Sequence, residues 1–462
     1  MAAPHGRSGK TTATIGLLSA LKSAGYAVQA YKKGPDFIDP GWMNRITGRP
    51  CRNLDSFLMD KRVLRNSFVR STLDVDIAVV EGAMGLFDGV DLAGSGSTAE
   101  IAKAIATPVI LVVDTTRMTR SVAALVSGYQ HFDPGVQLAG VIINNVARPR
   151  HESILRASIE QYCGLPVLGA IPREDVFYLP ERHLGLVPAA EDDALAEAVL
   201  RFGDAVGGLL DLNGIAELAR RAPPLAVEVS PGGAPVMRTQ RLQELSPAAS
   251  RTKVAVFLDR AFTFYYPENL EALVAAGAGL VTVNTLNDRK MPEVDAAYIG
   301  GGFPEVFAAD ISANVTLLSD LRERIEAGLP VYAECGGLMF LSRSIYWQGV
   351  KYAMAGALPL DVVMLNKPQG HGYITLQVEN SSPYFAAGES VKGHEFHHSL
   401  VENLGEEIKF AFRVTKGYGI DGRHDGVLYK NVLACYTHIH ALATTGWAPS
   451  LVAAGEKYGA AR

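Results

Sequence analysis

The stretch Gly6-Arg7-Ser8-Gly9-Lys10-Thr11-Thr12 decides the fold, because it has the composition of a phosphate-binding loop that runs into a helix. Glycines let backbone N–H groups approach a phosphate, and the N-terminus of a helix adds a favourable dipole. Lys10 would meet the β- and γ-phosphates of a nucleotide, and the Thr11 hydroxyl would hold Mg²⁺. The predicted nucleotide-binding residues are Gly6, Gly9, Lys10, Thr11 and Thr12.

This motif departs from the strict spacing of such loops at its first position, where Pro4 stands in place of glycine. Because only three residues precede Pro4, the strand that normally leads into the loop is expected to be missing. The sequence indicates a truncated start or an unusual opening to the sheet, and either would weaken nucleotide binding. The alternative for this motif alone is a Gly-Lys helix start that binds no ligand.

Short apolar runs alternate with helical patterns over residues 1–222, as at 77–80 and 109–113. This βαβ rhythm predicts a parallel sheet covered by helices. Residues 223–251 are rich in Pro, Ala, Gly and Ser, which predicts a linker between domains. A second set of strands and helices follows over residues 252–462, so the sequence predicts two α/β domains in series.

The composition of the 462-residue chain is that of an ordinary globular protein, with 48% hydrophobic and 20% charged residues. The formal net charge of −5 comes without a basic block, so no surface for nucleic acid is expected. The longest apolar run, 108–113, is far shorter than the roughly 20 residues of a membrane span, and no signal sequence is visible. Four scattered cysteines suit a reducing compartment. We expect a cytoplasmic protein that binds small molecules and no membrane.

Two loops of the first domain are rich in charged residues. Residues 32–40 carry two bases and two acids around Gly and Pro, and residues 81–89 carry two acids in a Gly-rich turn. Glu81 ends an apolar strand, where phosphate-loop enzymes place an acid that binds Mg²⁺ or water. Such loops are expected to position a metal and an acidic substrate, and the alternative is a pair of tight turns with solvated charges.

Cys335 lies between an apolar strand at residues 331–333 and a helix that begins with Gly336-Gly337. A nucleophile on such a turn is exposed, sits near a helix N-terminus that favours the thiolate, and has the Gly336 N–H beside it as an oxyanion donor. The turn Gly300-Gly301-Gly302 follows another apolar strand, and its amides would supply a second donor. The remaining cysteines are predicted to be small core residues: Cys51, Cys163 and Cys435.

A nucleophilic cysteine needs a base, and the residue types alone leave two choices. His438 follows an apolar strand, whereas His394, His397 and His398 form a separate group. By spacing, that group could also be a metal site, although no Cys or further acid cluster completes a tetrahedral set.

Eight motifs, taken in this order, resemble the cobyrinate a,c-diamide synthase family over about residues 3–450. They are Gly9-Lys10-Thr11-Thr12, Lys33-Gly34-Pro35-Asp36-Phe37-Ile38-Asp39-Pro40, Asn53-Leu54-Asp55, the 81–89 segment, Gly300-Gly301-Gly302-Phe303-Pro304-Glu305, Glu334-Cys335-Gly336-Gly337, Gly393-His394-Glu395-Phe396-His397 and Tyr436-Thr437-His438. The resemblance implies a dethiobiotin-synthetase-like ATP domain, residues 1–222, fused to a class I glutamine amidotransferase domain, residues 252–462. The implied activity is the ATP-dependent conversion of the a and c acetate side chains of a modified tetrapyrrole to amides, with glutamine as the nitrogen donor.

The same resemblance implies roles for individual residues. Cys335 matches the family nucleophile, and His438 matches the histidine that activates it. The acids used around Mg²⁺, ATP and the carboxylate substrate match Asp36, Glu81 and Asp88, with Thr11 and Glu81 at the metal and Lys33 steadying the substrate. Oxyanion donors are expected at Gly301, Gly302 and Gly336. Glutaminase triads place a Glu two residues after the histidine, but this chain has His440 there, so a Cys/His dyad is implied.

The resemblance also indicates which tetrapyrrole is the substrate. Gly41-Trp42-Met43-Asn44 replaces the histidine that vitamin-pathway members usually have after the Asp-Pro of residues 39–40, and the motif begins with Lys32-Lys33. Together with Lys416-Gly417-Tyr418-Gly419 and Asp421-Gly422-Arg423-His424-Asp425-Gly426, this resembles the siroheme amidase branch linked to dissimilatory sulfite reductase, which favours siroheme over cobyrinate, with a nickel-sirohydrochlorin as a third option. The expected partners are ATP, glutamine and a tetrapyrrole polycarboxylate, and a homodimer is one option for the assembly. The alternative function is a nucleotide-binding regulatory or assembly protein without turnover.

Overall fold

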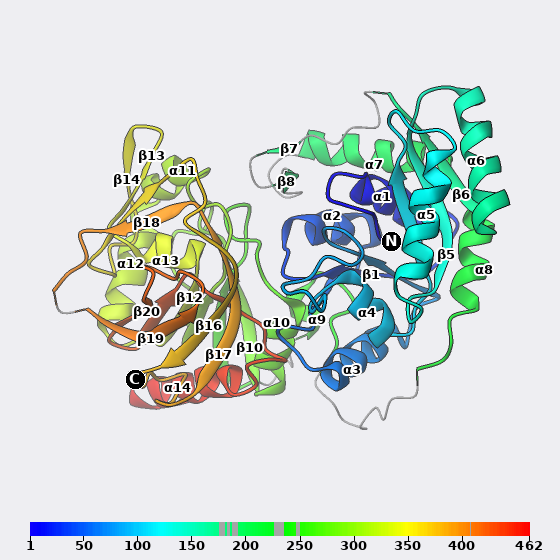
Figure 1. Ribbon diagram of the computed structural model, residues 1–462. Coiled ribbons are helices and arrows are strands. Elements are labelled where there is room, and N and C mark those ends of the chain that lie inside the picture. Colours follow the sequence, from blue (N-terminus) through cyan, green and yellow to red (C-terminus); the bar gives the residue numbers. More distant parts are fainter. Residues whose placement is uncertain (175–180, 183–184, 187–192, 226–234, 246–249, 407) are drawn as a thin grey trace. The chain divides into compact units, whose positions relative to one another are not determined.

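The computed structural model describes residues 1–174, 181–182, 185–186, 193–225, 235–245, 250–406 and 408–462. The chain forms two compact units, Met1–Gly233 with Arg238–Gln240, and Ala234–Met237 with Arg241–Arg462 (Figure 1). Within the predicted linker, residues 226–234 and 246–249 lie outside the described part, and Met237 and Leu242 are buried in the core of the second unit. The linker bounds therefore stay a prediction. Among the described residues, no helix is long and apolar enough to cross a membrane.

The first unit contains two parallel three-stranded sheets with the orders β2-β1-β3 and β4-β5-β6. Their strands are β1 Val28–Lys33, β2 Arg52–Leu54, β3 Ile77–Glu81, β4 Val109–Asp114, β5 Leu138–Val146 and β6 Val167–Pro172, and a separate antiparallel pair is β7 Glu181–Arg182 with β8 Gly185–Leu186. The helices are α1 Lys10–Ser23, α2 Ile38–Thr47, α3 Lys61–Thr72, α4 Thr98–Ala104, α5 Ser121–Phe132, α6 Pro149–Cys163, α7 Asp193–Gly207 and α8 Leu212–Arg220. This is the βαβ arrangement that the sequence predicts.

Residues 1–3 lie between the two sheets and connect them. The Met1 amine donates to Val80 O of β3 at 2.8 Å, and Gly82 N donates back to Met1 O at 2.8 Å. On the other side, Ala2 N donates to Ile110 O of β4 at 2.9 Å, and Val112 N donates to Ala2 O at 2.7 Å. The expectation that no strand leads into the loop is therefore wrong in part, because these few residues make strand-like hydrogen bonds to both neighbours.

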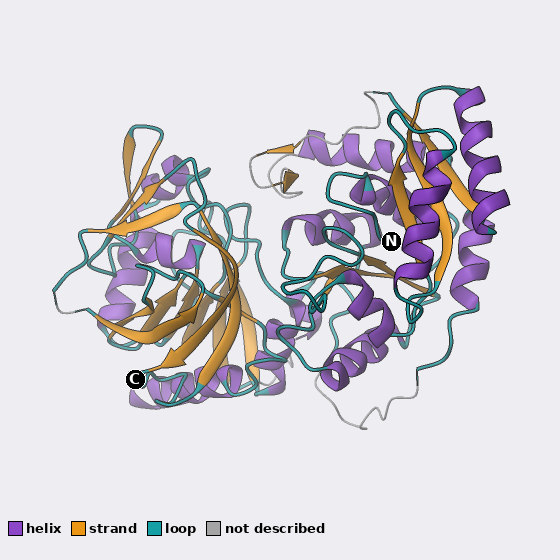
Figure 2. Cartoon of the chain, viewed as in Figure 1, coloured by secondary structure: helices purple, strands orange, loops and turns teal. Residues whose placement is uncertain are grey.

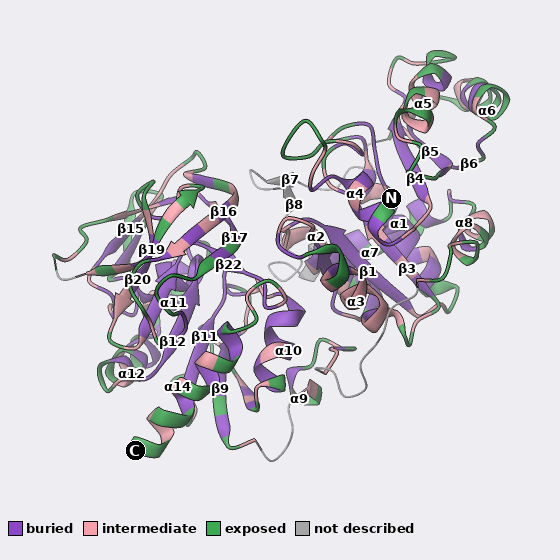
Figure 3. Cartoon of the chain, turned by 60° about the horizontal axis from the view of Figure 1, so that its bottom comes forward, coloured by how far each residue is buried: buried purple, intermediate pink, exposed green. Residues whose placement is uncertain are grey.

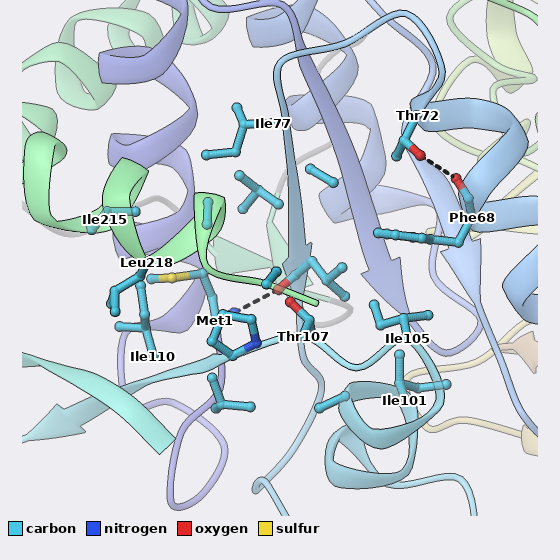
Figure 4. Close-up of a pocket in the computed structure, with 18 of the residues that line it drawn as sticks. Met1, Phe68, Thr72, Ile77, Ile101, Ile105, Thr107, Ile110, Ile215 and Leu218 are labelled. Atoms are coloured by element: carbon cyan, nitrogen blue, oxygen red, sulfur yellow. Dashed lines mark hydrogen bonds between the residues drawn. The ribbon is translucent and has the colours of Figure 1, made fainter. Parts of the chain in front are cut away.

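A cavity of about 390 Å³ opens beside this connecting segment. Figure 4 shows Met1 at its wall with Ile77 of β3, Ile110 of β4 and Leu218 of α8. None of the predicted site residues lines it, and its walls are mainly apolar. The cavity is therefore distinct from the phosphate loop.

The second unit is built mainly of strands (Figure 2). Its main sheet has ten strands in the order β10-β9-β11-β12-β21-β20-β19-β16-β17-β22, and a smaller sheet has the order β14-β13-β15-β18. The strands are β9 Thr252–Phe257, β10 Ala278–Val283, β11 Ala296–Ile299, β12 Val331–Glu334, β13 Ser344–Trp347, β14 Val350–Ala353, β15 Asp361–Met364, β16 Gly370–Val378, β17 Ser390–His397, β18 Ser399–Glu402, β19 Lys409–Lys416, β20 His424–Tyr429, β21 Val432–Cys435 and β22 His438–Ile439. The helices are α9 Leu242–Leu245, α10 Pro267–Ala275, α11 Ala308–Ala313, α12 Val315–Glu326, α13 Gly336–Leu341 and α14 Trp447–Ala461.

Each unit has strands that are buried along almost their whole length. In the first unit β4 is buried along almost its whole length, and in the second unit all residues of β12 are buried (Figure 3). A strand of a parallel sheet that helices cover on both faces reads as a continuous apolar run, as Val109–Asp114 does. The predicted α/β class, a parallel phosphate-loop sheet followed by an amidotransferase-like α/β domain, is confirmed.

Candidate active sites

The phosphate loop of the first unit is shaped by Gly9, which precedes α1 with a φ of 92°. A Cβ on Gly9 would lie 2.1 Å from Nδ2 of Asn144, so only glycine fits between the loop and β5. Asn144 Nδ2 in turn donates to Ser8 O at 3.1 Å. The first N–H groups of a helix have no partner within the helix, so the start of α1 offers them to an anion. The loop therefore has the form that the motif predicts.

Lys10 joins the phosphate loop to the 81–89 segment. Its Nζ donates to Met84 O at 2.7 Å and to His5 O at 3.3 Å. Burial lowers the pKa of Lys10 to about 8, although the Glu81 carboxylate opposes this shift. The lysine is thus held in place, and it loses its charge at a lower pH than an exposed lysine does.

Thr11 and Glu81 lie together at the predicted metal position. The Thr11 hydroxyl donates to Glu81 Oε1 at 2.8 Å, and Glu81 is fully buried at the end of β3. Among the described residues, the other carboxylate oxygen, Oε2, has no hydrogen-bond partner. A hydroxyl beside a carboxylate with a spare oxygen is the hard donor set that Mg²⁺ prefers. The residues present therefore fit a magnesium ion.

Lys32 belongs to the same cluster, and we did not predict it as a site residue. Its Nζ donates to Glu81 Oε1 at 2.8 Å and to Asp39 Oδ2 at 2.5 Å, and it lies 3.7 Å from Asp36 Oδ2. Although burial opposes the shift, these carboxylates raise the pKa of Lys32 well above its usual value. The signal that would have found Lys32 is strand register, because it lies directly opposite Glu81 in the β1–β3 pair.

The other predicted residues of this unit are placed as follows. Asp36 Oδ1 accepts from Ile38 N at 2.8 Å, and burial raises the pKa of Asp36, with the Asp39 charge adding to it. Asp88 Oδ2 accepts from Gly85 N at 2.9 Å and acts electrostatically on Lys10. The structure thus brings Lys10, Thr11, Asp36, Glu81 and Asp88 into one charged cluster.

Lys33, Gly6 and Thr12 lie at the margin of this cluster. Lys33 follows Lys32 on β1, so its side chain points to the opposite face, where Asp55 and Glu100 act on it. Burial lowers the pKa of Lys33. A Cβ on Gly6 would meet no atom within 4 Å, so space does not require glycine there, and Thr12 lies in the first turn of α1.

In the second unit, Cys335 stands at a sharp turn between β12 and α13. Its backbone has a φ of 48°, in the left-handed region, and its N–H donates to Cys435 O at 2.7 Å. Burial raises the pKa of the Cys335 thiol, and the Glu305 carboxylate adds to this, while the Gly336 N–H opposes it. Cys335 is buried, so the expectation of an exposed residue whose thiolate is favoured is wrong: burial favours the thiol, and a base is needed to activate it.

The glycine turn lies between the cysteine loop and His438. A Cβ on Gly336 would lie 3.0 Å from Gly302 N, and a Cβ on Gly301 would lie 2.4 Å from Cε1 and 3.3 Å from Nε2 of His438. These approaches are too close for a side chain, which explains the glycines. The glycine turn, Gly301-Gly302, thus approaches His438 on one side and Gly336, the residue after Cys335, on the other.

The other histidines have different surroundings. His397 stacks on Tyr436 with ring centroids 3.6 Å apart, and its Nδ1 lies 3.0 Å from Ser399 O. His394 stacks on His438 at 4.9 Å and contacts the Tyr266 hydroxyl through Nδ1 at 3.2 Å. Within the described part of the chain, no group of three or more His, Cys, Asp or Glu residues is arranged to hold a metal ion. The structure gives no support to a metal site at residues 394–398.

Asp425 holds the two residues that precede His438, Tyr436 and Thr437, in place. The sequence did not predict Asp425 as a site residue. It accepts hydrogen bonds from Tyr436 N at 3.0 Å, from Thr437 N at 3.1 Å and from the Thr437 hydroxyl at 2.5 Å. Burial raises its pKa, and the Thr437 hydrogen bond opposes this. The residue positions the two-residue connection between β21 and β22, so its effect on the site is through His438.

Comparison with known proteins finds a matching domain family for each unit. A family model described as "CobQ/CobB/MinD/ParA nucleotide binding domain" matches residues 1–187, and one described as "CobB/CobQ-like glutamine amidotransferase domain" matches residues 253–446. A cobyrinate a,c-diamide synthase of Magnetococcus marinus is 46% identical over 96% of this chain and 94% of the relative. The proteins of the same name from Archaeoglobus fulgidus and Methanosarcina acetivorans are 41% and 40% identical, over 96% and 100% of this chain and 94% and 96% of theirs.

Proposed function

Because this chain belongs to the cobyrinate a,c-diamide synthase family, we propose that it uses ATP and glutamine to convert the a and c acetate carboxylates of a tetrapyrrole to amides. The chain is a glutamine-dependent carbon–nitrogen ligase, so the alternative of a regulatory protein without turnover is not pursued. The observation that supports the proposal is the charged cluster of Lys10, Thr11, Asp36, Glu81 and Asp88 in the first unit, together with the Cys335 turn beside the glycine turn in the second.

The first half-reaction belongs to the phosphate-loop unit. A carboxylate is a poor acyl donor, so a carboxylate oxygen attacks the γ-phosphorus of ATP, the bond to the β-phosphate oxygen breaks, and an acyl phosphate and ADP form. Lys10 offsets the charge that develops on the transferred phosphoryl group. Thr11 and Glu81 would hold Mg²⁺, which neutralises phosphate charge when bound. Asp36 and Asp88 complete the acidic surroundings. The side chain of Lys33 lies on the opposite face of β1, so its expected role of steadying the acid substrate has no support from this geometry.

The second half-reaction belongs to the cysteine unit. The Cys335 thiol gives its proton to His438, and the thiolate attacks the amide carbon of glutamine. The N–H groups of the glycine turn and of Gly336 stabilise the oxyanion. The C–N bond then breaks, the proton leaves with ammonia, and water hydrolyses the glutamyl thioester to glutamate. Ammonia attacks the acyl phosphate, and phosphate departs.

Three tetrapyrroles are candidates for the substrate: cobyrinate, siroheme and a nickel-sirohydrochlorin. The names of the relatives support cobyrinate. Siroheme is supported only by resemblance; of residues 41–44, Trp42 and Met43 are buried in the core of the first unit, whereas Gly41 and Asn44 are partly exposed. Cobyrinate is therefore the first substrate to test, and siroheme is the second.

The test is an amidation assay with purified protein, Mg·ATP and either glutamine or ammonium chloride. Cobyrinate, siroheme and nickel-sirohydrochlorin are supplied in parallel, and mass spectrometry follows the conversion of two carboxylates to amides. We expect one tetrapyrrole to be diamidated with both nitrogen sources, with ADP released in step. Absence of tetrapyrrole-dependent ADP formation with all three compounds would overturn the proposal.

A further inference from the structure

Glu334, the residue immediately before Cys335, faces the imidazole of His438. It ends β12, is only 1% exposed, and its Oε2 lies 3.4 Å from His438 Nδ1. This distance is slightly longer than a normal hydrogen bond, as is common for catalytic groups before substrate binds. A carboxylate is therefore present on the side of the imidazole opposite to Nε2.

The Glu334 carboxylate is fixed in this orientation by two donors. Oε1 accepts from Ile439 N at 3.1 Å, and Oε2 accepts from the Tyr298 hydroxyl at 3.1 Å. The Tyr298 oxygen is held in turn by Asn269 Nδ2 at 3.1 Å. Because Ile439 directly follows His438, one contact ties the carboxylate to the backbone that carries the imidazole.

The position two residues after His438 does not supply this carboxylate. His440 stands there, and its Nε2 lies 3.6 Å from Oε2 of another buried acid, Glu268. A neutral imidazole carries one N–H, so a base whose Nε2 must accept a proton needs an acceptor at Nδ1 to keep the N–H there.

We propose that Glu334 is the positioning residue of the glutaminase site, supplying from the strand before the nucleophile the carboxylate that is missing after the histidine. The inference rests on the proposed roles of Cys335 and His438. The thiol proton moves from Sγ to His438 Nε2, and the Nδ1 proton stays in place, facing Glu334. The resulting imidazolium is stabilised by the carboxylate until it returns a proton to the departing ammonia, so no proton is transferred to Glu334.

The test is Glu334→Gln, assayed by glutamate release. Its Oε1 must still accept from Ile439 N–H, so the amide NH₂ replaces Oε2 and donates toward His438 Nδ1. This favours the wrong tautomer of His438. We expect kcat for glutamine hydrolysis to fall about 10²–10⁴-fold, with KM for glutamine within about threefold of the native value. Amidation with ammonium chloride should be unchanged.

The matched control is Glu268→Gln, which removes an equally buried carboxylate from a Glu–His pair of similar length. It should leave kcat within about threefold while costing a similar amount of thermal stability. Equal losses of kcat in both variants would overturn the proposal, because they would show a general effect of removing buried charge.

A double-mutant cycle tests whether Glu334 acts through His438. When His438 is already replaced by Asn, Glu334→Gln should lower kcat for glutamine hydrolysis by less than about a further threefold, because the imidazole that Glu334 orients is absent. Multiplicative losses would overturn the proposal. If Glu334→Gln fails to fold, proton NMR of the native protein decides, since a downfield Nδ1–H resonance that His438→Asn removes is expected and its absence contradicts the proposal.

Different results would contradict the proposed glutaminase function of Cys335 and the proposed role of Glu334. If Cys335→Ala still hydrolyses glutamine at a near-native rate, the proposed function of this site fails, and the role of Glu334 fails with it. If Cys335→Ala is inactive and Glu334→Gln is near native, only the role of Glu334 fails.

Discussion

The two sites differ in the charge that their key residues carry before a substrate binds. In the phosphate-loop unit, Lys32 lies within 4 Å of three carboxylates, and Glu81 keeps one oxygen without a partner among the described residues. In the cysteine unit, burial holds Cys335 as a neutral thiol beside a neutral glycine turn. The first site holds a cluster of charges before a highly charged ligand binds, whereas in the second site the nucleophile becomes charged only when His438 takes the thiol proton, next to the buried Glu334 carboxylate. The variants below separate these two designs.

The largest effect is expected from Cys335→Ala. Without a nucleophile, glutamine hydrolysis should fall by roughly 10⁴-fold or more. Amidation with ammonium chloride should persist, because the charged site of the first unit is intact. The control is Cys435→Ala, which alters the fully buried neighbour across the β12–β21 pair and should keep glutaminase activity. Native glutamine hydrolysis by Cys335→Ala would show that the nucleophile is misassigned.

The opposite pattern is expected from Glu81→Gln. Loss of the charged ligand beside Thr11 should reduce ATP-dependent amidation by roughly 10²–10³-fold with either nitrogen source. Glutamine hydrolysis at Cys335 should be unaffected, which serves as the internal control for folding. Ammonia-dependent amidation that survives in Glu81→Ala, Asp88→Ala would mean that both acids only form turns. The contrast between the two sites would then disappear.

The smallest effect is a pH dependence of nucleotide binding through Lys10. Because its pKa is lowered to about 8, the free protein loses this charge above that pH, while bound phosphate favours the protonated form. The Kd for Mg·ATP should therefore rise above pH 8, by at most about tenfold per pH unit, and binding should take up a proton. Calorimetry in two buffers measures both quantities. In Lys10→Arg, which stays charged, the slope should vanish; a persisting slope would assign it to another group.

Local motifs predicted the parts of each site that a few consecutive residues determine. Gly9-Lys10-Thr11 and Cys335-Gly336 each combine a special backbone conformation with the start of a helix, and both features are encoded locally. Lys32 was missed because its role depends on lying opposite Glu81 in the β1–β3 register. Glu334 was missed because its partner, His438, arrives from a distant strand.

The predicted fold class was recovered, but the short strand segment at residues 1–3 was not. Periodicity gives no signal over three residues, and only the hydrogen bonds to β3 and β4 identify their position. Asp425 was similarly invisible, because a buried acid that accepts three hydrogen bonds from one turn looks like any loop aspartate in the sequence. Tertiary contacts, and not local propensity, determine such residues.

The short connection between β21 and β22 has a consequence for folding. Only Tyr436 and Thr437 separate an inner strand of the main sheet from its edge strand, so the sheet must curve back before His438 can pair with β17. Pairings between distant segments of a chain form slowly. During refolding from denaturant, far-UV circular dichroism should therefore recover first, and glutamine hydrolysis should return in a later kinetic phase, when the edge strand closes.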